Sequence, residues 1–496
     1  MAVTRVVDRV SFSFAGTSYR VGRRAAWRGA DTDRVSKSSD SRSSIPVDRT
    51  LSSPPTYSAR SHNDAFRVMG AEFDAAGDAT LRRRRSLVRV AFAGGDFSRL
   101  VGALTISQAG DWLYNVGLLV YLFNRTHSAS WVAAGTIVRL LPYLFFEPIG
   151  GVVADRWDRR KVMIGSDLLR AVCMGALTIV ATSSITPAVA LAVVFLASAA
   201  GTPYVPAVSA TTPALVPESD LAAANAAIET ITNGTIIVGP AIGGLLLAVG
   251  PPSVGFAINA LSFLFAAGLV SRLSFRRAAP SATLDSVSIF RQFGEGVHAL
   301  RSSAAGVVLI AFEMSMAFVY GEQTVLLLLA AQQKLGTGSA GYGYLFAAIG
   351  LGGVLAVGLT GRIAAAPRVG TTLGVALVLG SAPMALLAFV NQMLVAFALM
   401  VVIGGAAIII DVLDATWLQR IFPSDVLGRI FGLKGAAIIG AILAGALLAP
   451  ILISSLGLNW ALVVSGIGLP TLPLLGLPAL RHVGRAVTAR GEEAPF

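Results

Sequence analysis

The stretch Gly150–Lys161, which reads GGVVADRWDRRK, decides the fold of this chain. Six of the seven residues from Asp155 to Lys161 are charged, whereas the flanking segments, roughly 131–153 and 162–184, are almost entirely apolar. A charged run of this kind cannot lie within hydrocarbon. Because each flanking segment is long enough to cross a bilayer, we expect the stretch to be a loop on a membrane surface.

The composition is typical of an integral membrane protein. Hydrophobic residues make up 54% and charged residues 13% of the sequence, whereas an ordinary soluble domain has about 25% charged residues. The 52 glycines suit helices that approach one another closely in lipid. The net charge of +12 does not indicate a nucleic-acid partner, because the arginines gather in the N-terminal tail and in alternate loops, as membrane topology requires.

Apolar windows of about 20 residues recur along the chain, and each can span roughly 30 Å of hydrocarbon. They predict an all-α membrane protein with twelve transmembrane helices, six on each side of the long connection 274–305. The predicted domains are a helical half at 91–273, the linker, and a second helical half at 306–480. The windows are 98–122, 130–153, 162–184, 187–208, 223–248, 252–273, 306–330, 341–362, 369–389, 391–412, 430–454 and 457–480.

The distribution of basic residues predicts the orientation. Arginines occupy the segment before the first window, the second, sixth, eighth and tenth connections, and the segment after the last window. The odd-numbered connections contain only Arg125 and Lys334. Since basic residues are retained on the cytoplasmic side, we expect a multi-pass protein of the cell membrane with both termini in the cytoplasm.

The charged loop carries the pattern Gly-x-x-x-Asp-Arg-x-x-Arg-Arg, formed by Gly151, Asp155, Arg156, Arg159 and Arg160. This pattern resembles the signature loop of the major facilitator superfamily, although that family usually has Gly where this chain has Asp158. The resemblance implies the major facilitator fold, in which two six-helix halves rock about a shared interface. It also implies that Asp155 belongs to a gate on the cytoplasmic side.

The fifth window contains a second pattern, GPAIGG, with Gly239, Pro240, Gly243 and Gly244. Glycine allows close helix contact, and proline permits a bend. Together with the preceding run, which holds Asn225, it resembles the drug, macrolide and siderophore exporters of the superfamily. The fourth window contains no charged residue, so the proton-relay role attributed to an arginine in that helix of many drug antiporters cannot be transferred.

Two charged residues are expected near the middle of the membrane, where each charge costs about 2.5–3.5 kcal/mol on insertion scales. Asp111 lies midway along the first window and Arg139 near the middle of the second. Because these windows are antiparallel neighbours, we predict that Asp111 and Arg139 pair at similar depth. The pair is either a static support of the first half or a protonatable aspartate whose proton affinity is set by Arg139.

The seventh window contains two glutamates, Glu313 and Glu322. Nine residues at about 100° each place them on opposite faces of a helix, so at most one lines a central cavity. Glu313 shares a face with Met316 and Tyr320, a soft and partly aromatic wall suited to large apolar ligands. We predict that Glu313 lines the cavity and carries protons, and that Glu322 lies nearer the outer surface and is hydrated.

Charged residues near the cytoplasmic ends of other windows are expected to form gating pairs. These residues are Glu229 in the fifth window and Asp411, Asp414 and Arg420 at the end of the tenth. In the third window, Asp167 and Arg170 are about one turn apart, and we predict that they pair with each other or with the adjacent loop.

The segments outside the helical halves have a different composition. Residues 1–90 are rich in Ser, Arg and Asp and lack an apolar signal region. We expect a disordered basic cytoplasmic tail there, with Met69 as an alternative translation start. Residues 481–496 form a second cytoplasmic tail.

The connection 274–305 is predicted to contain a short helix. Four apolar residues recur there at helical spacing, namely Val287, Phe290, Phe293 and Val297. Such a helix either lies on the inner leaflet of the membrane or is a plain linker without a lipid role.

Soluble chemistry has little support in the sequence. There is no Gly-x-x-x-x-Gly-Lys-Ser/Thr loop for direct use of ATP. The four histidines are not clustered with the single cysteine, Cys173, as a metal site would require. We therefore expect no enzymatic activity, no cofactor and no metal.

The resemblance and the intramembrane charges predict secondary transport, with protons and a small molecule as ligands and the lipid bilayer as surroundings. We expect proton-coupled efflux of an amphipathic molecule that is drug-, macrolide- or siderophore-like, by a monomer. Proton-coupled uptake is the first alternative, because only GPAIGG favours export. A non-transporting membrane sensor or scaffold is an alternative of another class.

Overall fold

The computed structural model describes residues 13–14, 17–18, 95–274, 289–364 and 369–480. The chain divides into two compact units, Met1–Ala71 and Glu72–Phe496. In the first unit the described residues form two short antiparallel strands, β1 (Ser13–Phe14) and β2 (Thr17–Ser18). The rest of the predicted N-terminal tail and the C-terminal tail lie outside the described residues.

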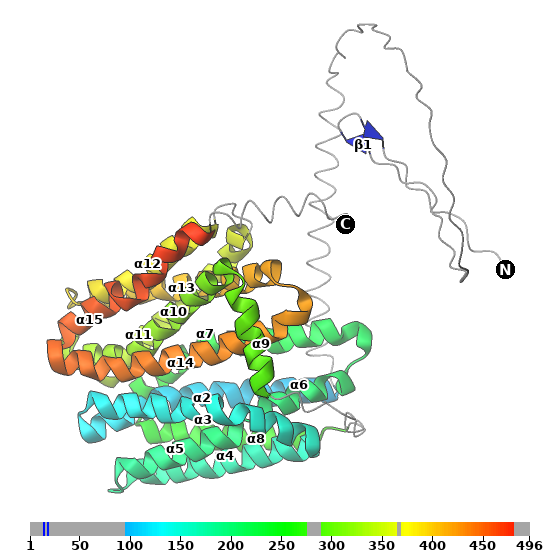
Figure 1. The fold of residues 1–496 in the computed structure, drawn as a ribbon. Helices are drawn as coiled ribbons and strands as arrows, with labels where there is room; N and C mark the ends of the chain where they lie inside the picture. Colours follow the sequence, from blue (N-terminus) through cyan, green and yellow to red (C-terminus); the bar gives the residue numbers. More distant parts are fainter. Residues whose placement is uncertain (1–12, 15–16, 19–94, 275–288, 365–368, 481–496) are drawn as a thin grey trace, which may run out of the picture. The chain divides into compact units, whose positions relative to one another are not determined.

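The first helical half lies in the second unit and is drawn from blue to green in Figure 1. Its elements are α2 (Asp96–Thr126), α3 (Ala129–Arg156), α4 (Arg159–Thr182), α5 (Pro187–Gly201), α6 (Tyr204–Leu215), η1 (Glu218–Asp220), α7 (Leu221–Val249) and α8 (Pro252–Ser271). The predicted fourth window is two helices, because Pro203 lacks a backbone N–H and interrupts the hydrogen bonds between α5 and α6.

The second helical half follows α9 (Ile289–Arg301), which confirms the helix predicted in the linker. The half consists of α10 (Ala304–Leu329), η2 (Ala330–Lys334), α11 (Gly338–Ala364), α12 (Val369–Leu387), α13 (Met393–Ile421), α14 (Ser424–Leu456), α15 (Leu458–Ile467) and η3 (Leu469–Gly476). The chain reverses between α14 and α15 at Gly457, whose φ of 78° lies in the left-handed region that glycine adopts without steric cost.

The described residues contain nine helical stretches that are long and apolar enough to cross a membrane. The last of them, Val426–Leu480, contains both α14 and α15. Helices α2 and α7 have 31 and 29 residues and are not among the nine. The all-α membrane fold is thus confirmed, while the count of twelve crossings stays a prediction.

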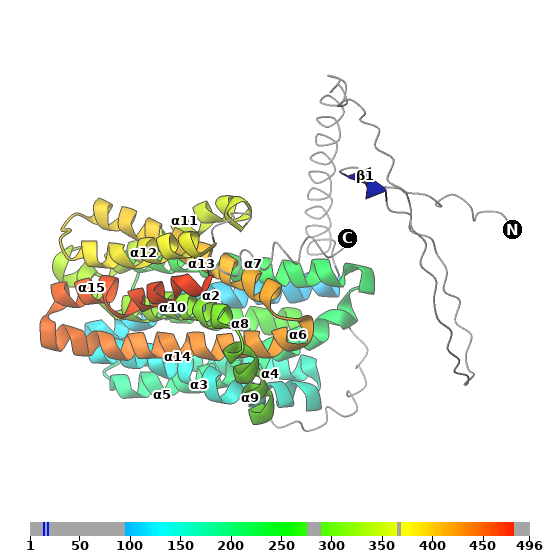
Figure 2. The ribbon, with the colours of Figure 1, turned by 45° about the horizontal axis from the view of Figure 1, so that its top comes forward.

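The two halves meet mainly through two pairs of helices. Helix α7 packs against α11, and α3 packs against α14. Helices α7 and α14 are the fifth expected crossings of their halves, and α3 and α11 are the second. The fifth crossing of each half therefore contacts the second crossing of the other half. This reciprocal arrangement is typical of two halves related by a pseudo-two-fold axis. Figures 1 and 2 both show α3, α4 and α5 grouped apart from α12, α13 and α15.

The halves touch closely at one end of the bundle. Near the end of α7 and the start of α11, Gly244 lies so close to Gly343 that a Cβ on either residue would overlap the other's backbone. The Thr136 hydroxyl donates to Thr324 Oγ1 at 3.2 Å, again between the halves. In contrast, four glycines in the first half of α14, nearer the charged loop, face open space: Gly428, Gly432, Gly435 and Gly440. The halves are therefore closed at the end opposite the charged loop.

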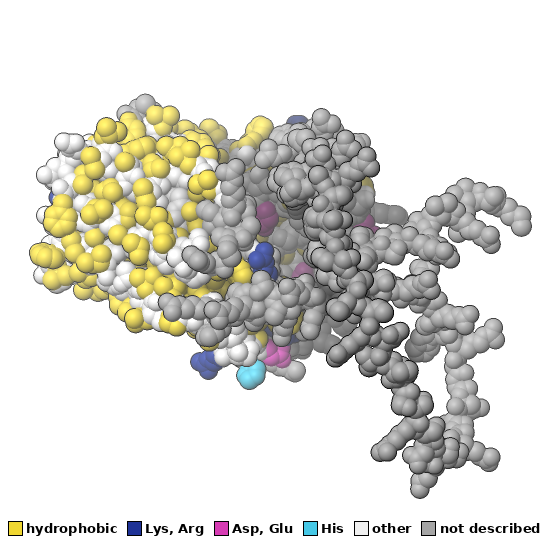
Figure 3. Space-filling model, turned by 90° about the horizontal axis from the view of Figure 1, so that it is seen from above, with side chains coloured by type: hydrophobic (Ala, Val, Ile, Leu, Met, Phe, Trp, Pro, Cys, Tyr) yellow, Lys and Arg dark blue, Asp and Glu magenta, His cyan; other side chains and the backbone are white. Residues whose placement is uncertain are grey.

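The surface of the helical unit is largely apolar. Figure 3 shows hydrophobic side chains over most of the visible face of the described helices. Large exposed hydrophobic residues occur in both halves, among them Phe265 in α8, Leu355 in α11 and Leu447 in α14. A soluble monomer rarely exposes so extensive an apolar surface, so this surface is suited to contact with lipid chains.

Candidate functional site

The charged loop ties the start of α4 to other helices of its own half. The Asp158 carboxylate caps α4, because Oδ1 accepts hydrogen bonds from the backbone N–H groups of Arg160 (3.0 Å) and Lys161 (3.2 Å). Arg159 donates to the Ala210 carbonyl of α6 at 2.7 Å, and Arg160 donates to the Ser271 carbonyl at the end of α8. Aspartate is a preferred N-cap residue, which explains why it can replace the Gly expected at position 158.

The remaining residues of the loop pattern are free of such contacts. Asp155 and Arg156 are exposed in the last turn of α3, and neither makes a hydrogen bond or ion pair within the described ranges. A Cβ at Gly151 would meet no heavy atom within 4 Å. Asp155 is thus exposed at the charged-loop end of the bundle, but its predicted gating role stays a prediction.

The GPAIGG pattern is a small-residue surface on which two neighbouring helices pack. A Cβ at Gly239 would overlap the Trp112 side chain of α2, and one at Gly243 would lie 3.1 Å from the Trp112 carbonyl oxygen. Gly244 faces the other way, onto Gly343 of α11. The pattern therefore holds α7 against its own half through α2 and against the second half through α11.

We define the N-terminal cluster as Asp111, Arg139 and Arg170. Arg170 Nη2 lies 2.6 Å from Asp111 Oδ2, and the Asn259 amide donates to Asp111 Oδ1 at 3.5 Å. The Arg170 guanidinium lies 3.9 Å from the centre of the Phe263 ring. The predicted Asp111–Arg139 pair is therefore wrong. Helices α2 and α4 both pack on α8, and this brings Arg170 of α4 to Asp111 although α3 is nearer in sequence.

The predicted pair of Asp167 and Arg170 is also wrong among the described residues. Arg170 is engaged by Asp111, while the fully buried Asp167 lies near the Tyr204 hydroxyl of α6. Among the described residues, Arg170 makes its ion pair across to α2 and makes none with Asp167 on its own helix.

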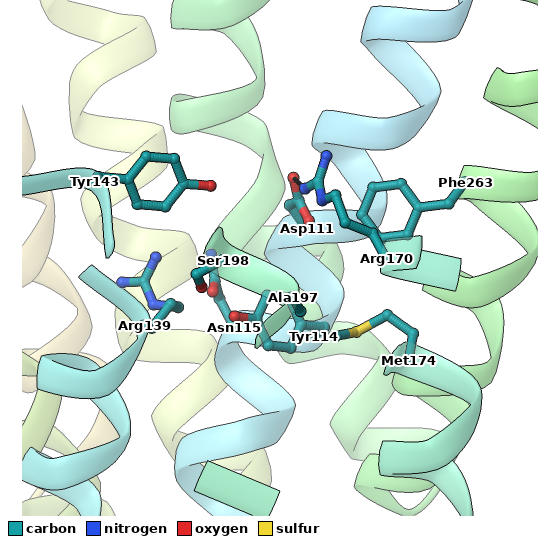
Figure 4. Close-up of a pocket in the computed structure, with 10 residues that line it drawn as sticks. All are labelled: Asp111, Tyr114, Asn115, Arg139, Tyr143, Arg170, Met174, Ala197, Ser198 and Phe263. Atoms are coloured by element: carbon teal, nitrogen blue, oxygen red, sulfur yellow. Dashed lines mark hydrogen bonds and ion pairs between the residues drawn. The ribbon is translucent and has the colours of Figure 1, made fainter. Parts of the chain in front are cut away.

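A pocket of the first half is lined by residues of α2, α3, α4, α5 and α8, and Figure 4 shows these residues. Arg139 stands on one side of it and the Asp111–Arg170 pair on the other. The lining residues are Asp111, Tyr114, Asn115, Arg139, Tyr143, Arg170, Met174, Ala197, Ser198 and Phe263. Counting the space open to solvent, the pocket has a volume of about 380 Å³. Its wall thus combines two guanidinium groups with one carboxylate and several neutral polar groups.

We define the C-terminal cluster as Glu313 of α10, Asp411 and Asp414 of α13, and Lys434 of α14. Lys434 Nζ lies 2.7 Å from Asp414 Oδ2 and 3.4 Å from Asp411 Oδ1. Glu313 interacts electrostatically with all three, and its Oε2 atom is buried without a hydrogen-bond partner in the described part of the chain. The Asp414 side chain is fully buried, whereas 54% of the Asp411 side chain is exposed. The cluster therefore extends from the protein interior to open space.

The comparisons with known proteins identify the family. Residues 91–484 match the family of transmembrane secretion effectors. The chain belongs to this family. It is similar to macrolide efflux protein A of Streptococcus pyogenes, with 30% identity over 216 residues. That match covers 43% of this chain and 53% of the relative, so it spans about half the length of the macrolide efflux protein.

Other relatives of this secretion-effector chain match over a greater length. The enterobactin exporter EntS of Escherichia coli is 29% identical over 416 residues, covering 78% of this chain and 93% of EntS. A solved structure of the peptide transporter POT has a TM-score of 0.62 at 12% identity and covers 81% of this chain and 99% of that chain. The nucleoside transporter NupG has a TM-score of 0.59 at 13% identity, with 79% and 98% covered. The matches place the chain in the major facilitator superfamily, beside relatives that are named as exporters. At these identities the solved structures show its fold alone.

Several charged residues of this secretion-effector chain do not have the partners that the sequence predicted. Arg420 does not join Asp411 or Asp414 in the described structure, since its guanidinium lies 5.0 Å from the centre of the Trp417 ring. Because α13 continues to Ile421, Asp411 is ten residues before the end of the helix, about 15 Å at a rise of ~1.5 Å per residue. It therefore lies deeper than predicted. Glu229 is exposed and has no partner among the described residues.

The two sides of α10 also differ from the prediction. Glu322 is only 1% exposed and lies near Ser465 of α15, so the prediction that it is hydrated is wrong. Met316 is buried against Gly380 of α12 and does not form a cavity wall with Glu313. Tyr320 makes an edge contact with the Phe346 ring at 6.2 Å. Other helices thus cover more faces of α10 than its sequence periodicity predicted.

Lys434 is the charged residue that the sequence reasoning missed. It lies five residues inside the apolar window 430–454, where a lysine is costly unless it has a partner. That position was the available signal. The available partners were Glu313 and Asp411 in other windows and Asp414 just after the tenth window.

Proposed function

We propose that this protein is a secondary active transporter that exports an amphipathic small molecule from the cytoplasm in exchange for protons. The observation that carries the proposal is the C-terminal cluster, in which Lys434 makes ion pairs with two carboxylates and a third, Glu313, is close enough to interact with it electrostatically. When all four groups are ionised, three negative charges and one positive charge sum to −2, which is costly at membrane depth. A proton or a cationic group of the substrate relieves this excess, so the two compete for the same carboxylates.

Glu313 is the residue that we assign to proton exchange. Lys434 is held by Asp414 and Asp411, whereas Glu313 Oε2 has no hydrogen-bond partner among the described residues. A proton on Glu313 reduces the negative charge of the cluster without breaking an existing ion pair. Its release on the other side of the membrane restores the carboxylate for the next cycle.

Export also requires a cavity that opens to each side in turn. The contact of Gly244 with Gly343 and the Thr136–Thr324 hydrogen bond support closure at the end opposite the charged loop. We propose that the loop end faces the cytoplasm, so that this state receives substrate from inside. Asp155 would then close the loop end by binding the end of a helix from the second half.

The relatives suggest which molecules to test. Macrolide efflux protein A and the enterobactin exporter are named for two different classes of cargo. We propose that the substrate of this chain is likewise an amphipathic molecule of drug, macrolide or siderophore type. Uptake and the absence of transport are the alternatives that the experiment must distinguish.

The first experiment is a transport screen in an efflux-deficient bacterial host, followed by accumulation assays in everted membrane vesicles. A macrolide, a catecholate siderophore and a lipophilic cation serve as probes. Export predicts accumulation in energised everted vesicles and its loss when an uncoupler removes the proton gradient. Accumulation only in right-side-out vesicles would establish uptake, and no movement of any probe would favour a sensor or scaffold.

The role of Glu313 is tested by Glu313→Gln in the same vesicles. We expect proton-driven export of the lipophilic cation to fall by about tenfold or more, because the neutral side chain can neither release a proton nor attract the cation. Energy-independent exchange should remain detectable. Glu322→Gln should have a milder effect, and Glu218→Gln, in the exposed turn η1, is the matched control. A larger loss with Glu322→Gln than with Glu313→Gln would transfer the role to Glu322.

A further inference from the structure

We infer that the pocket beside Arg139 is a subsite for an anionic group of the transported molecule, a carboxylate or phenolate carried on an apolar body. The inference rests on the proposed transport function and adds to it the charge of one part of the substrate. It starts from a cation that the described structure leaves without a counter-charge.

Arg139 is the guanidinium without a carboxylate partner in this pocket. It makes no hydrogen bond and no ion pair within the described ranges, whereas the other guanidinium, Arg170, is paired with Asp111 at 2.6 Å. The nearby Asp167 is fully buried and does not line the pocket. Two arginines and one aspartate give the lining a net charge of +1. A positive charge at membrane depth is normally paired, so the unpaired guanidinium indicates a ligand of opposite sign.

The neutral groups around Arg139 complete an oxyanion site. Tyr143 stands one turn further along α3, with its hydroxyl directed into the pocket (Figure 4). Tyr114 of α2 lies near Ser198 of α5, and both line the pocket. Asn115 also lines the pocket, and its Nδ2 group is the amide donor on this side. Hydroxyl and amide donors beside a planar guanidinium are well suited to a carboxylate or phenolate, because each oxygen can accept more than one hydrogen bond.

The pocket also lies where a bound anion would affect both halves. Arg139 is three residues from Thr136, which donates a hydrogen bond to Thr324 of α10. Tyr320 of α10 and Tyr342 of α11 are electrostatic neighbours of Arg139. An anion that neutralises Arg139 therefore acts next to the closed contact between the halves. The C-terminal cluster has the opposite excess charge, so a substrate with an anionic and a cationic group can satisfy both regions.

The test compares two probes of equal shape that differ in charge, 2-naphthoate and 2-naphthamide. Their binding to the full-length purified protein in lipid nanodiscs is measured by calorimetry. We expect the naphthoate to bind about tenfold to a hundredfold more tightly, as is typical of charge-assisted hydrogen bonds. Arg139→Gln should remove this preference. Arg139→Lys should retain part of it, because lysine keeps the charge but not the planar fork.

Arg125→Gln is the matched control, since Arg125 lies outside the pocket and donates to the Ile185 carbonyl. It should leave the preference for naphthoate unchanged. Thermal unfolding provides a second readout. Arg139→Gln should unfold close to the temperature of the control, because it strands no carboxylate, whereas Arg170→Gln should unfold at a lower temperature. Equal affinity of the wild type for both probes, or a preference that survives Arg139→Gln, would overturn the inference. So would a loss of stability in Arg139→Gln as large as in Arg170→Gln.

Transport and the subsite can fail separately. If naphthoate binds through Arg139 but no probe is exported from everted vesicles, the transport proposal is wrong and the anion site stands as a binding site. If probes are exported but naphthoate and naphthamide bind alike, the transport proposal stands and the subsite is wrong.

Discussion

The two charged clusters differ in the sign of the charge that their own side chains leave without a partner. In the N-terminal cluster, Asp111 is matched by Arg170 and the group left over is a cation, Arg139. In the C-terminal cluster, one lysine makes ion pairs with two carboxylates and interacts electrostatically with a third, and the groups left over are acids. An anion would balance the charge of the N-terminal cluster, and a proton or another cation would reduce the negative charge of the C-terminal cluster. The comparison indicates that the charge of a ligand of such a protein can be inferred from the charged side chains that have no partner of opposite charge in the protein itself.

The largest effect is expected from the lysine that holds the C-terminal cluster together. Lys434→Gln leaves Asp411, Asp414 and Glu313 without a cation, and breaking a buried ion pair costs about 3–5 kcal/mol. We expect a correspondingly lower free energy of unfolding, measured by denaturant titration in mixed micelles. Arg170→Gln should cost less, because Arg170 makes an ion pair with one carboxylate only.

Lys161→Gln, an exposed position in the first turn of α4, provides the control for the loss of a lysine. Adding Asp414→Asn to Lys434→Gln should recover part of the lost stability. A Lys434→Gln protein as stable as the control would show that the carboxylates do not depend on the lysine, and the contrast between the clusters would disappear.

A double-mutant cycle in the N-terminal cluster sharpens the same comparison. We expect Asp111→Asn and Arg170→Gln to be coupled by about 0.5–3 kcal/mol in the free energy of unfolding, as is typical of residues in contact. The cycle of Asp111→Asn with Arg139→Gln should show much weaker coupling, because these two residues make no hydrogen bond or ion pair. The reverse order of the two coupling energies would restore Arg139 as the partner of Asp111.

The smallest effect is expected at the charged loop of the first half. Asp158→Ala removes the N-cap of α4 and should lower the free energy of unfolding by about 1 kcal/mol. Asp158→Asn should be nearly neutral, since asparagine caps helices equally well. Glu218→Ala, in the exposed turn η1, is the control. If Asp158→Asn were as harmful as Asp158→Ala, the aspartate would act through its charge and not through capping.

The fold followed from the sequence because membrane crossings depend on length and apolar composition. A break between the second and third crossings was predicted correctly, but it consists of Trp157 and Asp158 alone, and the rest of Gly150–Lys161 belongs to α3 and α4. Each apolar window coincides with one helix or with two helices in succession. The helix ends were less certain, because a helix can continue in polar residues beyond the hydrocarbon. Helix α13 shows this, since the predicted window 391–412 ends nine residues before Ile421.

The partners of charged residues could be predicted only in part. Sequence neighbours suggested Arg139 for Asp111 and Arg420 for Asp414, whereas the observed partners, Arg170 and Lys434, come from helices further along the chain. Periodicity gives the face of a helix on which a residue lies but not which helix covers that face. Those contacts depend on how α2, α4 and α8 pack, and on how α13 and α14 present their charges to α10.

The contact between Gly244 and Gly343 has a genetic consequence. Elsewhere in a core, an oversized substitution can be suppressed by a smaller residue at the neighbouring position. Here neither glycine has a side chain to shorten, and a Cβ on either one meets backbone. No exchange within the pair can therefore rescue Gly244→Ala or Gly343→Ala. Suppressors should instead map to other residues of α7 and α11, where they can shift one helix against the other.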